Sequence, residues 1–186
     1  MKLSILSLLT LTSLSTATPA AVPVPAPIPQ DPRQTTAPTI LYPHRTYRTW
    51  ISTGTIKEDP QDQLLVVKDS NPLNESSALT TFSIPPDTAG LRCLLVIDLW
   101  DRDHSTGSQT VDVFTSIEPG RRDRHVGRVF LPRPGRGMWV GVYGWEEEFE
   151  CPAGEVIGFE FVGVGERVEV RWDIGVTGPL VYVLET

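Results

Sequence analysis

The chain has 186 residues, of which 40% are hydrophobic and 21% are charged. This length accommodates one folded domain with accessory segments and excludes a large multidomain enzyme. The formal net charge of -7 argues against a nucleic-acid partner, because binding a polyanion requires a net basic surface.

The N-terminal segment has the pattern of a secretory signal peptide. Lys2 supplies a positive charge, residues 3–14 are mostly apolar, and the small residues Ser15 and Ala17 suit cleavage after Ala17. As a helix, this apolar run would span roughly 18 Å, which is too short for a hydrocarbon core of about 30 Å. We therefore expect residues 1–17 to be removed and the mature protein to be secreted, extracellular or cell-wall associated, with no membrane segment.

Residues 18–39 form a proline-rich arm. From Val22 to Pro29 every second residue is proline and lacks the N–H group that a β-ladder needs. This composition favours polyproline II or disorder. We interpret the arm as a semi-rigid spacer, and a ligand for a proline-recognising groove is the alternative.

The domain at residues 40–186 shows a period of two rather than a helical period. Residues 168–174 alternate apolar and charged side chains, which is typical of a strand with one buried face. Residues 94–97 are apolar on both faces, which predicts a central strand. The pattern predicts an all-β fold, an antiparallel β-sandwich or flattened barrel of about nine or ten short strands. The expected strands are Thr46–Thr53, Gln63–Lys68, Ala78–Ile84, Arg92–Trp100, Thr110–Ile117, Val126–Leu131, Met138–Trp145, Val156–Val162, Val168–Ile174 and Leu180–Leu184.

Two cysteines in an exported chain predict one disulfide, between Cys93 and Cys151. The alternative, a cysteine nucleophile, requires a reduced thiol. Asn74 begins the single N-glycosylation sequon, and we expect it to be occupied in a surface loop.

Several segments resemble a known family. They are residues 79–85, 90–96 and 111–114, the stretch 149–160 with Cys151-Pro152-Ala153-Gly154 before an apolar strand, and Tyr42-Pro43. Together they resemble fungal secreted proteins with a But-two C-terminal domain, named after a yeast protein that binds the activating enzyme of a ubiquitin-like modifier. The resemblance covers about residues 42–184 and implies a β-sandwich with no catalytic residues to assign. The partner in the family name is intracellular, so a signal peptide argues against that partner here.

The motifs of several enzyme classes are missing from the sequence. It has no Gly-x-Ser-x-Gly element of lipases and no His-Glu-x-x-His element of zinc proteases. A copper oxidase would need an N-terminal histidine, whereas Thr18 is expected there and the three histidines are far apart in the sequence. We expect no cofactor.

Two acidic clusters each lie beside a tryptophan in the sequence, Trp100 and Trp145. The first contains Asp98, Asp101 and Asp103, and the second contains Glu146, Glu147 and Glu148. Carboxylates about 5 Å or 6.5 to 9.5 Å apart would suit a glycoside hydrolase, so a carbohydrate-active enzyme using residues 98–103 and 146–150 is the alternative function. The same oxygens suit calcium, although residues 98–104 lack the glycine and the distal glutamate of an EF-hand loop. Solvated loops are the simpler interpretation.

A basic strip lies between residues 121 and 136. Its arginines are Arg121, Arg122, Arg124, Arg128, Arg133 and Arg136. The strip is a candidate site for an anionic ligand, but we expect it to pair with the acidic residues 146–150 within the fold. Arg121-Arg122 is also a dibasic sequence that a secretory protease could cut.

The sequence predicts a secreted, non-catalytic β-sandwich protein that acts by binding or as structure at a fungal cell wall, cell surface or host interface. The expected partner is a cell-wall polysaccharide or an extracellular protein. For a protein partner, Trp100, Trp139 and Trp145 are candidate anchors, although most tryptophans are expected in the core.

Overall fold

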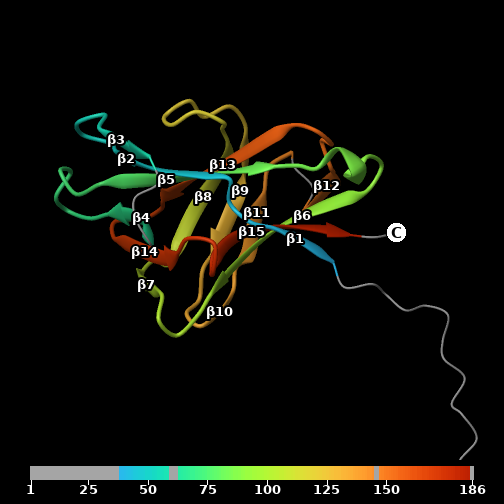
Figure 1. Cartoon of the computed structure of the whole chain (residues 1–186). Coiled ribbons are helices and arrows are strands. Elements are labelled where there is room, and N and C mark those ends of the chain that lie inside the picture. Colours follow the sequence, from blue (N-terminus) through green and yellow to red (C-terminus); the bar gives the residue numbers. More distant parts are fainter. Residues whose placement is uncertain (1–37, 59–62, 145–146, 185–186) are drawn as a thin grey trace, which may run out of the picture. The chain divides into compact units, whose positions relative to one another are not determined.

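The computed structural model describes residues 38–58, 63–144 and 147–184, which belong to the compact unit Thr35–Thr186. The expected signal peptide, the arm as far as residue 37, Trp145 and Glu146 lie outside the described residues. The described chain forms fifteen antiparallel strands and one 3-10 turn, η1 (Pro86–Thr88) (Figure 1). No helix among the described residues is long and apolar enough to cross a membrane.

The strands, labelled as in Figure 1, are β1 (Thr39–Leu41), β2 (Arg45–Trp50), β3 (Ile56–Glu58), β4 (Gln63–Lys68), β5 (Ser76–Ser83), β6 (Arg92–Leu99), β7 (His104–Gly107), β8 (Thr110–Thr115), β9 (His125–Phe130), β10 (Gly135–Arg136), β11 (Met138–Val142), β12 (Glu148–Glu150), β13 (Val156–Gly163), β14 (Val168–Asp173) and β15 (Gly178–Leu184).

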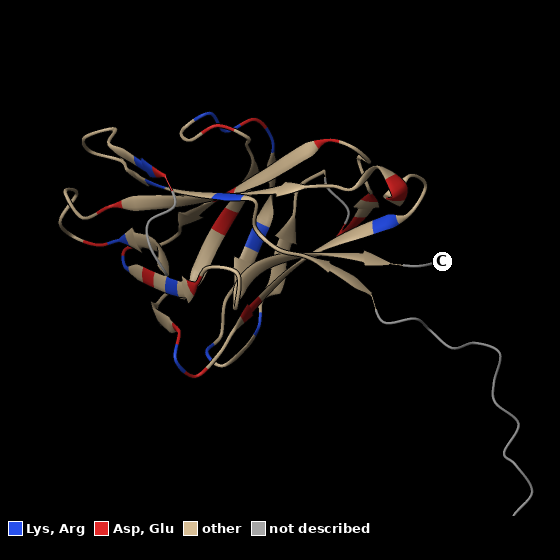
Figure 2. Cartoon of the chain, in the orientation of Figure 1, with Lys and Arg blue, Asp and Glu red and all other residues tan. Residues whose placement is uncertain are grey.

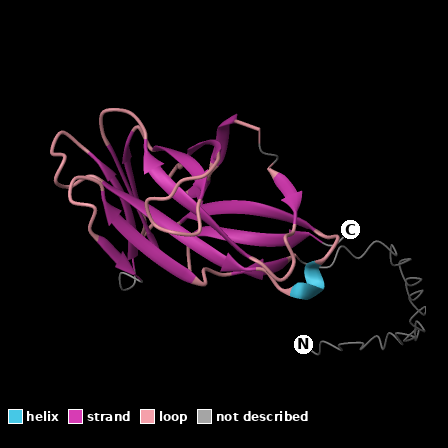
Figure 3. Ribbon diagram, turned by 90° about the horizontal axis from the view of Figure 1, so that it is seen from above, coloured by secondary structure: helices cyan, strands magenta, loops and turns pink. Residues whose placement is uncertain are grey.

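The strands form two sheets that curl into a half-barrel (Figure 3). The smaller sheet has the order β1-β15-β6-β10, and β12 also pairs with β6. The larger sheet has the order β11-β9-β8-β13-β5-β4-β14-β7, with β2 and β3 attached to β5. Strand β6 lies between β15 on one side and β10 and β12 on the other, as its two apolar faces predict.

The core lies between the two sheets and follows the period of two. In β14 the side chains of Val168, Val170 and Trp172 are buried, and the intervening polar residues are half-buried. The Trp172 ring packs edge-on against Phe161, with ring centres 5.7 Å apart. Because both sheets supply inward-facing apolar side chains, their burial is the main force that holds the sheets together.

The all-β, antiparallel prediction is confirmed, and each of the ten expected strands overlaps a strand of the structure. Several expected strands are too long at their C-terminal ends, and two differ most: β2 ends at Trp50, where Gly54 N donates to Trp50 O, and β11 ends at Val142. Five strands were not expected: β1, β3, β7, β10 and β12. They have two to four residues, too few to show a period of two, and they form because a longer strand offers its edge.

Candidate functional site

The Trp100 pocket lies where the chain leaves β6. Trp100 N donates to Asp103 Oδ2 at 2.6 Å, and Asp103 N donates to Trp100 O at 3.0 Å, so the two residues close a turn. Thr177 Oγ1 donates to the other oxygen, Asp103 Oδ1, at 3.0 Å. Asp103 is only 2% exposed. Its carboxylate therefore shapes the turn and is not available to a ligand.

The indole of Trp100 is held in place but stays 50% exposed. The guanidinium of Arg102 lies over the ring, 5.1 Å from its centre, and Arg102 Nε pairs with Asp173 Oδ2 at 2.9 Å. Together with Asp101 and Pro134, these two side chains line an open pocket of about 410 Å³. A cation stacked on indole attracts the negative face of the ring, so Arg102 fixes the ring orientation.

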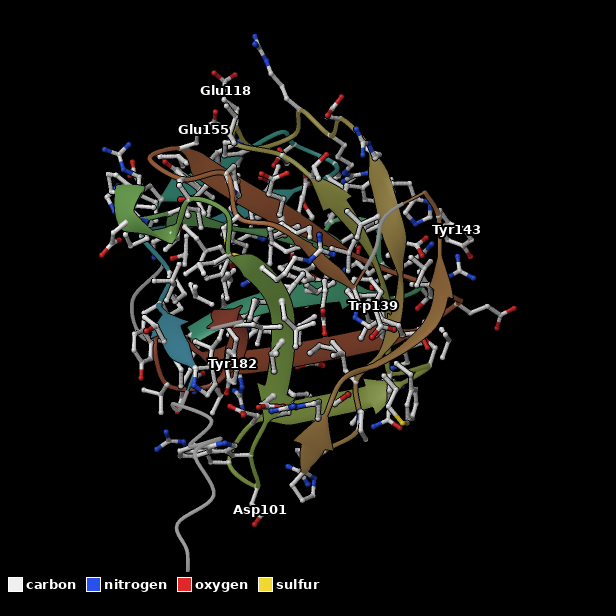
Figure 4. The ribbon with its side chains drawn as sticks, turned by 90° about the vertical axis from the view of Figure 1, so that its right-hand side faces the viewer. Asp101, Glu118, Trp139, Tyr143, Glu155 and Tyr182 are labelled. Atoms are coloured by element: carbon white, nitrogen blue, oxygen red, sulfur yellow. A yellow bond between two sulfur atoms is a disulfide. The ribbon has the colours of Figure 1, made fainter. Side chains whose placement is uncertain are left out.

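The loop that carries Pro134 is tied to the same turn. Arg133 Nη1 donates to Asp103 O at 2.9 Å and to Asp101 O at 3.3 Å. Asp101 is exposed at the end of the molecule (Figure 4). The pocket is therefore held rigidly, and its lining combines the apolar surfaces of Trp100 and Pro134 with the charged groups of Arg102 and Asp101.

Among the described residues, Asp98 and Glu148 of the two acidic clusters lie at different positions along β6. Asp98 lies in β6 and accepts two hydrogen bonds from Arg136, at 3.0 and 3.2 Å. Glu148, in β12, lies opposite Leu94, five residues before the end of β6 at Leu99. Asp98 is four residues from Leu94, so at about 3.3 Å per residue Asp98 and Glu148 are roughly 13 Å apart along the strand. That distance exceeds the spacing of paired carboxylates in glycoside hydrolases.

The alternative of a calcium site receives no support from the described residues. Among them, no group of three or more His, Cys, Asp or Glu side chains lies close enough to hold a metal ion. Glu147 and Glu148 are exposed, Asp103 is buried in the turn, and Glu146 is outside the described range.

Much of the basic strip is paired within the fold, but with carboxylates on other strands. Arg128 donates to Asp112 from Nε and Nη2, at 2.8 and 3.0 Å, and this hydrogen bond raises the pKa of Arg128. Asp112 and Arg128 are direct partners on β8 and β9 of the larger sheet. Figure 2 shows that acidic and basic residues lie on the strands as well as in the loops. Arg136 binds Asp98 in the same two-pronged way.

The prediction that the strip pairs with residues 146–150 is therefore wrong for Arg128 and Arg136. Arg121 Nη1 pairs with Glu118 Oε2 at 3.0 Å on the surface. Arg124 is exposed, and its side chain has no hydrogen-bonding or ionic partner among the described residues. Cross-strand register, which decides these pairs, cannot be read from a strip of like charges.

Glu160 is a buried acid that the sequence interpretation missed. It is 1% exposed in β13, where Ser77 Oγ donates to Oε1 at 2.7 Å and Arg122 Nη2 approaches Oε1 at 3.1 Å. Its Oε2 is buried without a hydrogen-bond partner among the described residues. Arg122 also lies over the ring of Phe114, 5.5 Å from its centre. The signal in the sequence was a single charge inside an otherwise apolar run, residues 156–163.

The disulfide between Cys93 and Cys151 is confirmed and leaves no free cysteine. The cysteine nucleophile is therefore excluded in this oxidised form. Asn74 is exposed in the turn before β5, where its Nδ2 donates to Asp69 Oδ2 at 3.2 Å. The surface position agrees with the expectation, and occupancy stays a prediction.

The tryptophans divide between core and surface. Trp172 is fully buried, Trp139 is partly buried against the core, and Trp50 is half-buried. Trp100 is the exposed tryptophan among the described residues. Of the three candidate anchors, the structure thus presents Trp100 and not Trp139.

The sequence matches no family model, and no curated protein matches it either. The resemblance to exported fungal proteins with a But-two C-terminal domain therefore stays a proposal. The choice of a function depends on the geometry of the pockets.

Proposed function

We propose that this chain is a secreted, non-catalytic binding protein of the But-two-like fungal group, and that its ligand is a neutral cell-wall polysaccharide. The observation that carries the proposal is the half-exposed indole of Trp100 in an open pocket of about 410 Å³. Soluble proteins usually bury tryptophan, and an indole that stays exposed on a rigid turn suits packing against an apolar ligand face. The C–H face of a pyranose ring is such a face.

The charges around the indole favour a neutral sugar. The charge of Arg102 is compensated by Asp173, 2.9 Å away, so it offers little attraction to an anion. The nearby Asp101 carboxylate is exposed and can accept hydrogen bonds from sugar hydroxyl groups. The same carboxylate would repel the uronic acids of pectin.

Rigidity supports the same proposal. Asp103 and Arg133 hold the turn through hydrogen bonds to Trp100 N, Asp101 O and Asp103 O. A surface that is already ordered loses little conformational entropy when a ligand binds. The distance between the acidic clusters along β6 supports a non-catalytic role, and the disulfide is compatible with an extracellular setting.

A pull-down with insoluble polysaccharides tests the proposal. The purified secreted protein is incubated with chitin, β-glucan, cellulose and pectin, at low and at moderate salt. We expect salt-resistant retention on a neutral polymer and a loss of at least about tenfold in affinity for Trp100→Ala, because a central aromatic anchor dominates binding. The matched control is Tyr143→Ala, which removes a 47% exposed aromatic ring that lies elsewhere on the molecule (Figure 4).

Three results would contradict this function. They are equal retention of Trp100→Ala and the unchanged protein, binding only to pectin with a strong salt dependence, and no retention on any polymer. The last result would favour an extracellular protein as the partner.

A further inference from the structure

Strand β13 extends beyond the end of its neighbour β8. Thr115, the last residue of β8, lies opposite Phe159, and Ser116 N then donates to Gly158 O at 2.9 Å. Val156 and Ile157 continue β13 past this bond. On its other side, β13 remains paired with β5 as far as Val156. The start of β13 is thus flanked by a strand on one side only.

The direction of the Val156 backbone groups follows from the register. In an antiparallel sheet, the N–H and C=O groups of successive residues point alternately to the two neighbouring strands. Glu155 O accepts from Ile84 N at 2.9 Å on the β5 side, whereas Gly158 O accepts from Ser116 N on the β8 side. Val156, two residues before Gly158, therefore directs its N–H and its C=O to the side that β8 has left.

The loop from β8 to β9 leaves this place open because it closes on itself. Ser116 Oγ donates to Glu118 O at 2.7 Å and to Arg121 O at 3.0 Å, and Asp123 N donates to Thr115 O at 2.9 Å. A pocket of about 490 Å³ remains between this loop and the start of β13.

The lining of this pocket is apolar at its strand side and charged at its loop side. Ile117 and Val156 are 62% and 48% exposed, and Ile157 lies beside them. Arg121, Asp123 and Arg124 complete the lining from the loop.

The charged side chains of the loop differ in whether they have a partner within the fold. Arg121 pairs with Glu118, and Asp123 Oδ2 accepts from Thr115 Oγ1 at 3.3 Å. The side chain of Arg124 has no partner among the residues that the structure describes. An acidic group on a ligand would therefore find Arg124 available.

We propose that this pocket binds an extended peptide, which adds a short strand to β13 at Val156. One donor and one acceptor on a strand edge are complemented by one residue of an extended peptide backbone, as in other cases of strand addition. An apolar side chain of the peptide enters the space beside Ile117 and Val156, and an acidic residue reaches Arg124. The peptide belongs to a second protein.

This site is separate from the Trp100 pocket. Figure 4 shows Glu118 and Glu155, which flank the loop and the start of β13, at one end of the molecule and Asp101 at the other. The two sites do not overlap; resting on the function proposed above for the Trp100 pocket, the protein would join a wall polymer to a second protein.

Hydrogen exchange at single amides tests the geometry. In the free, disulfide-bonded full chain, the Val156 amide should exchange at least tenfold faster than the Ile84 amide, which donates to Glu155 O. Peptides are then selected from a phage-displayed random dodecapeptide library against the same protein. We expect selected peptides to combine bulky apolar and acidic residues and to slow exchange at Val156 at least tenfold. The proposal is overturned if Val156 is already protected in the free protein, if no peptide is selected, or if bound peptides leave its exchange unchanged.

Two variants separate the backbone from the side-chain contribution. Val156→Pro removes the N–H donor at the first residue of a strand, a position that tolerates proline, and should weaken peptide binding at least tenfold. Arg124→Glu leaves β13 unchanged. It should lower the affinity for acidic peptides several-fold, while retention on polysaccharide stays as before. Full peptide affinity in both variants would refute strand addition at Val156.

Discussion

The pair formed by Arg122 and Glu160 allows a direct test of how this sheet tolerates a buried charge. Replacing Arg122 with Ala leaves the Glu160 carboxylate, 1% exposed, with Ser77 as its remaining partner among the described residues. Breaking a fully buried ion pair in this way costs about 3 to 5 kcal/mol. The Arg122 side chain is 33% exposed, and water can enter when it is removed, so we expect about 3 kcal/mol, the low end of that range.

A second substitution should recover most of this loss. Glu160→Gln in the Arg122→Ala background keeps an oxygen that accepts from Ser77 and removes the buried charge. We expect it to restore about 2 kcal/mol, because the desolvation cost of the unpaired carboxylate disappears. The double variant should therefore be more stable than Arg122→Ala alone.

Urea unfolding followed by tryptophan fluorescence measures these differences in the free energy of unfolding. The control is Arg121→Ala, the neighbouring arginine, whose side chain is 80% exposed and pairs with Glu118 at the surface. Its loss should change stability by less than about 0.5 kcal/mol. The reasoning is refuted if Arg122→Ala costs less than about 1 kcal/mol, or if adding Glu160→Gln lowers stability further.

Other parts of the fold give further predictions. Reduction of the Cys93–Cys151 disulfide, whose cysteines are 58 residues apart, should lower the free energy of unfolding by about 4 kcal/mol on the chain-entropy model; equal urea midpoints with and without reductant would contradict this. Gly178→Ala should cost more than about 2 kcal/mol, because the new Cβ would lie 2.3 Å from Trp172 Cδ1 at a φ of +79°. Gly54→Ala, at a φ of +66° with open space around it, should cost only about 1 kcal/mol in the same urea unfolding experiment, and equal losses at the two glycines would argue against the contact with Trp172.

The tryptophan-bearing turns show how far the sequence interpretation reached. The turn after β6 was identified as an acidic cluster beside Trp100, but its three aspartates take different roles. Asp98 pairs with Arg136, Asp103 is buried in the turn, and Asp101 remains exposed. The sequence shows that these aspartates lie near one another. It does not predict the hydrogen bond that Asp103 accepts from Thr177, because Thr177 is distant along the chain.

The buried Glu160 and the open edge at Val156 illustrate the same limit. An alternating pattern shows which residues share a face of one strand, but not which residue of the next strand lies opposite. Ser77 and Arg122 are 83 and 38 residues away from Glu160 along the chain. The position at which β8 ends relative to β13 likewise depends on the strand register, which the composition of the two strands does not reveal.

The sequence by itself determined the all-β class, the positions of the ten longer strands and the disulfide, because strand alternation and cysteine number are local properties. Only the tertiary structure decided the two-sheet topology, the short edge strands, the partners of the arginines and the exposure of Trp100. These features depend on backbone pairing between distant segments, and a shift of one residue in any strand would reverse which side chains face the core.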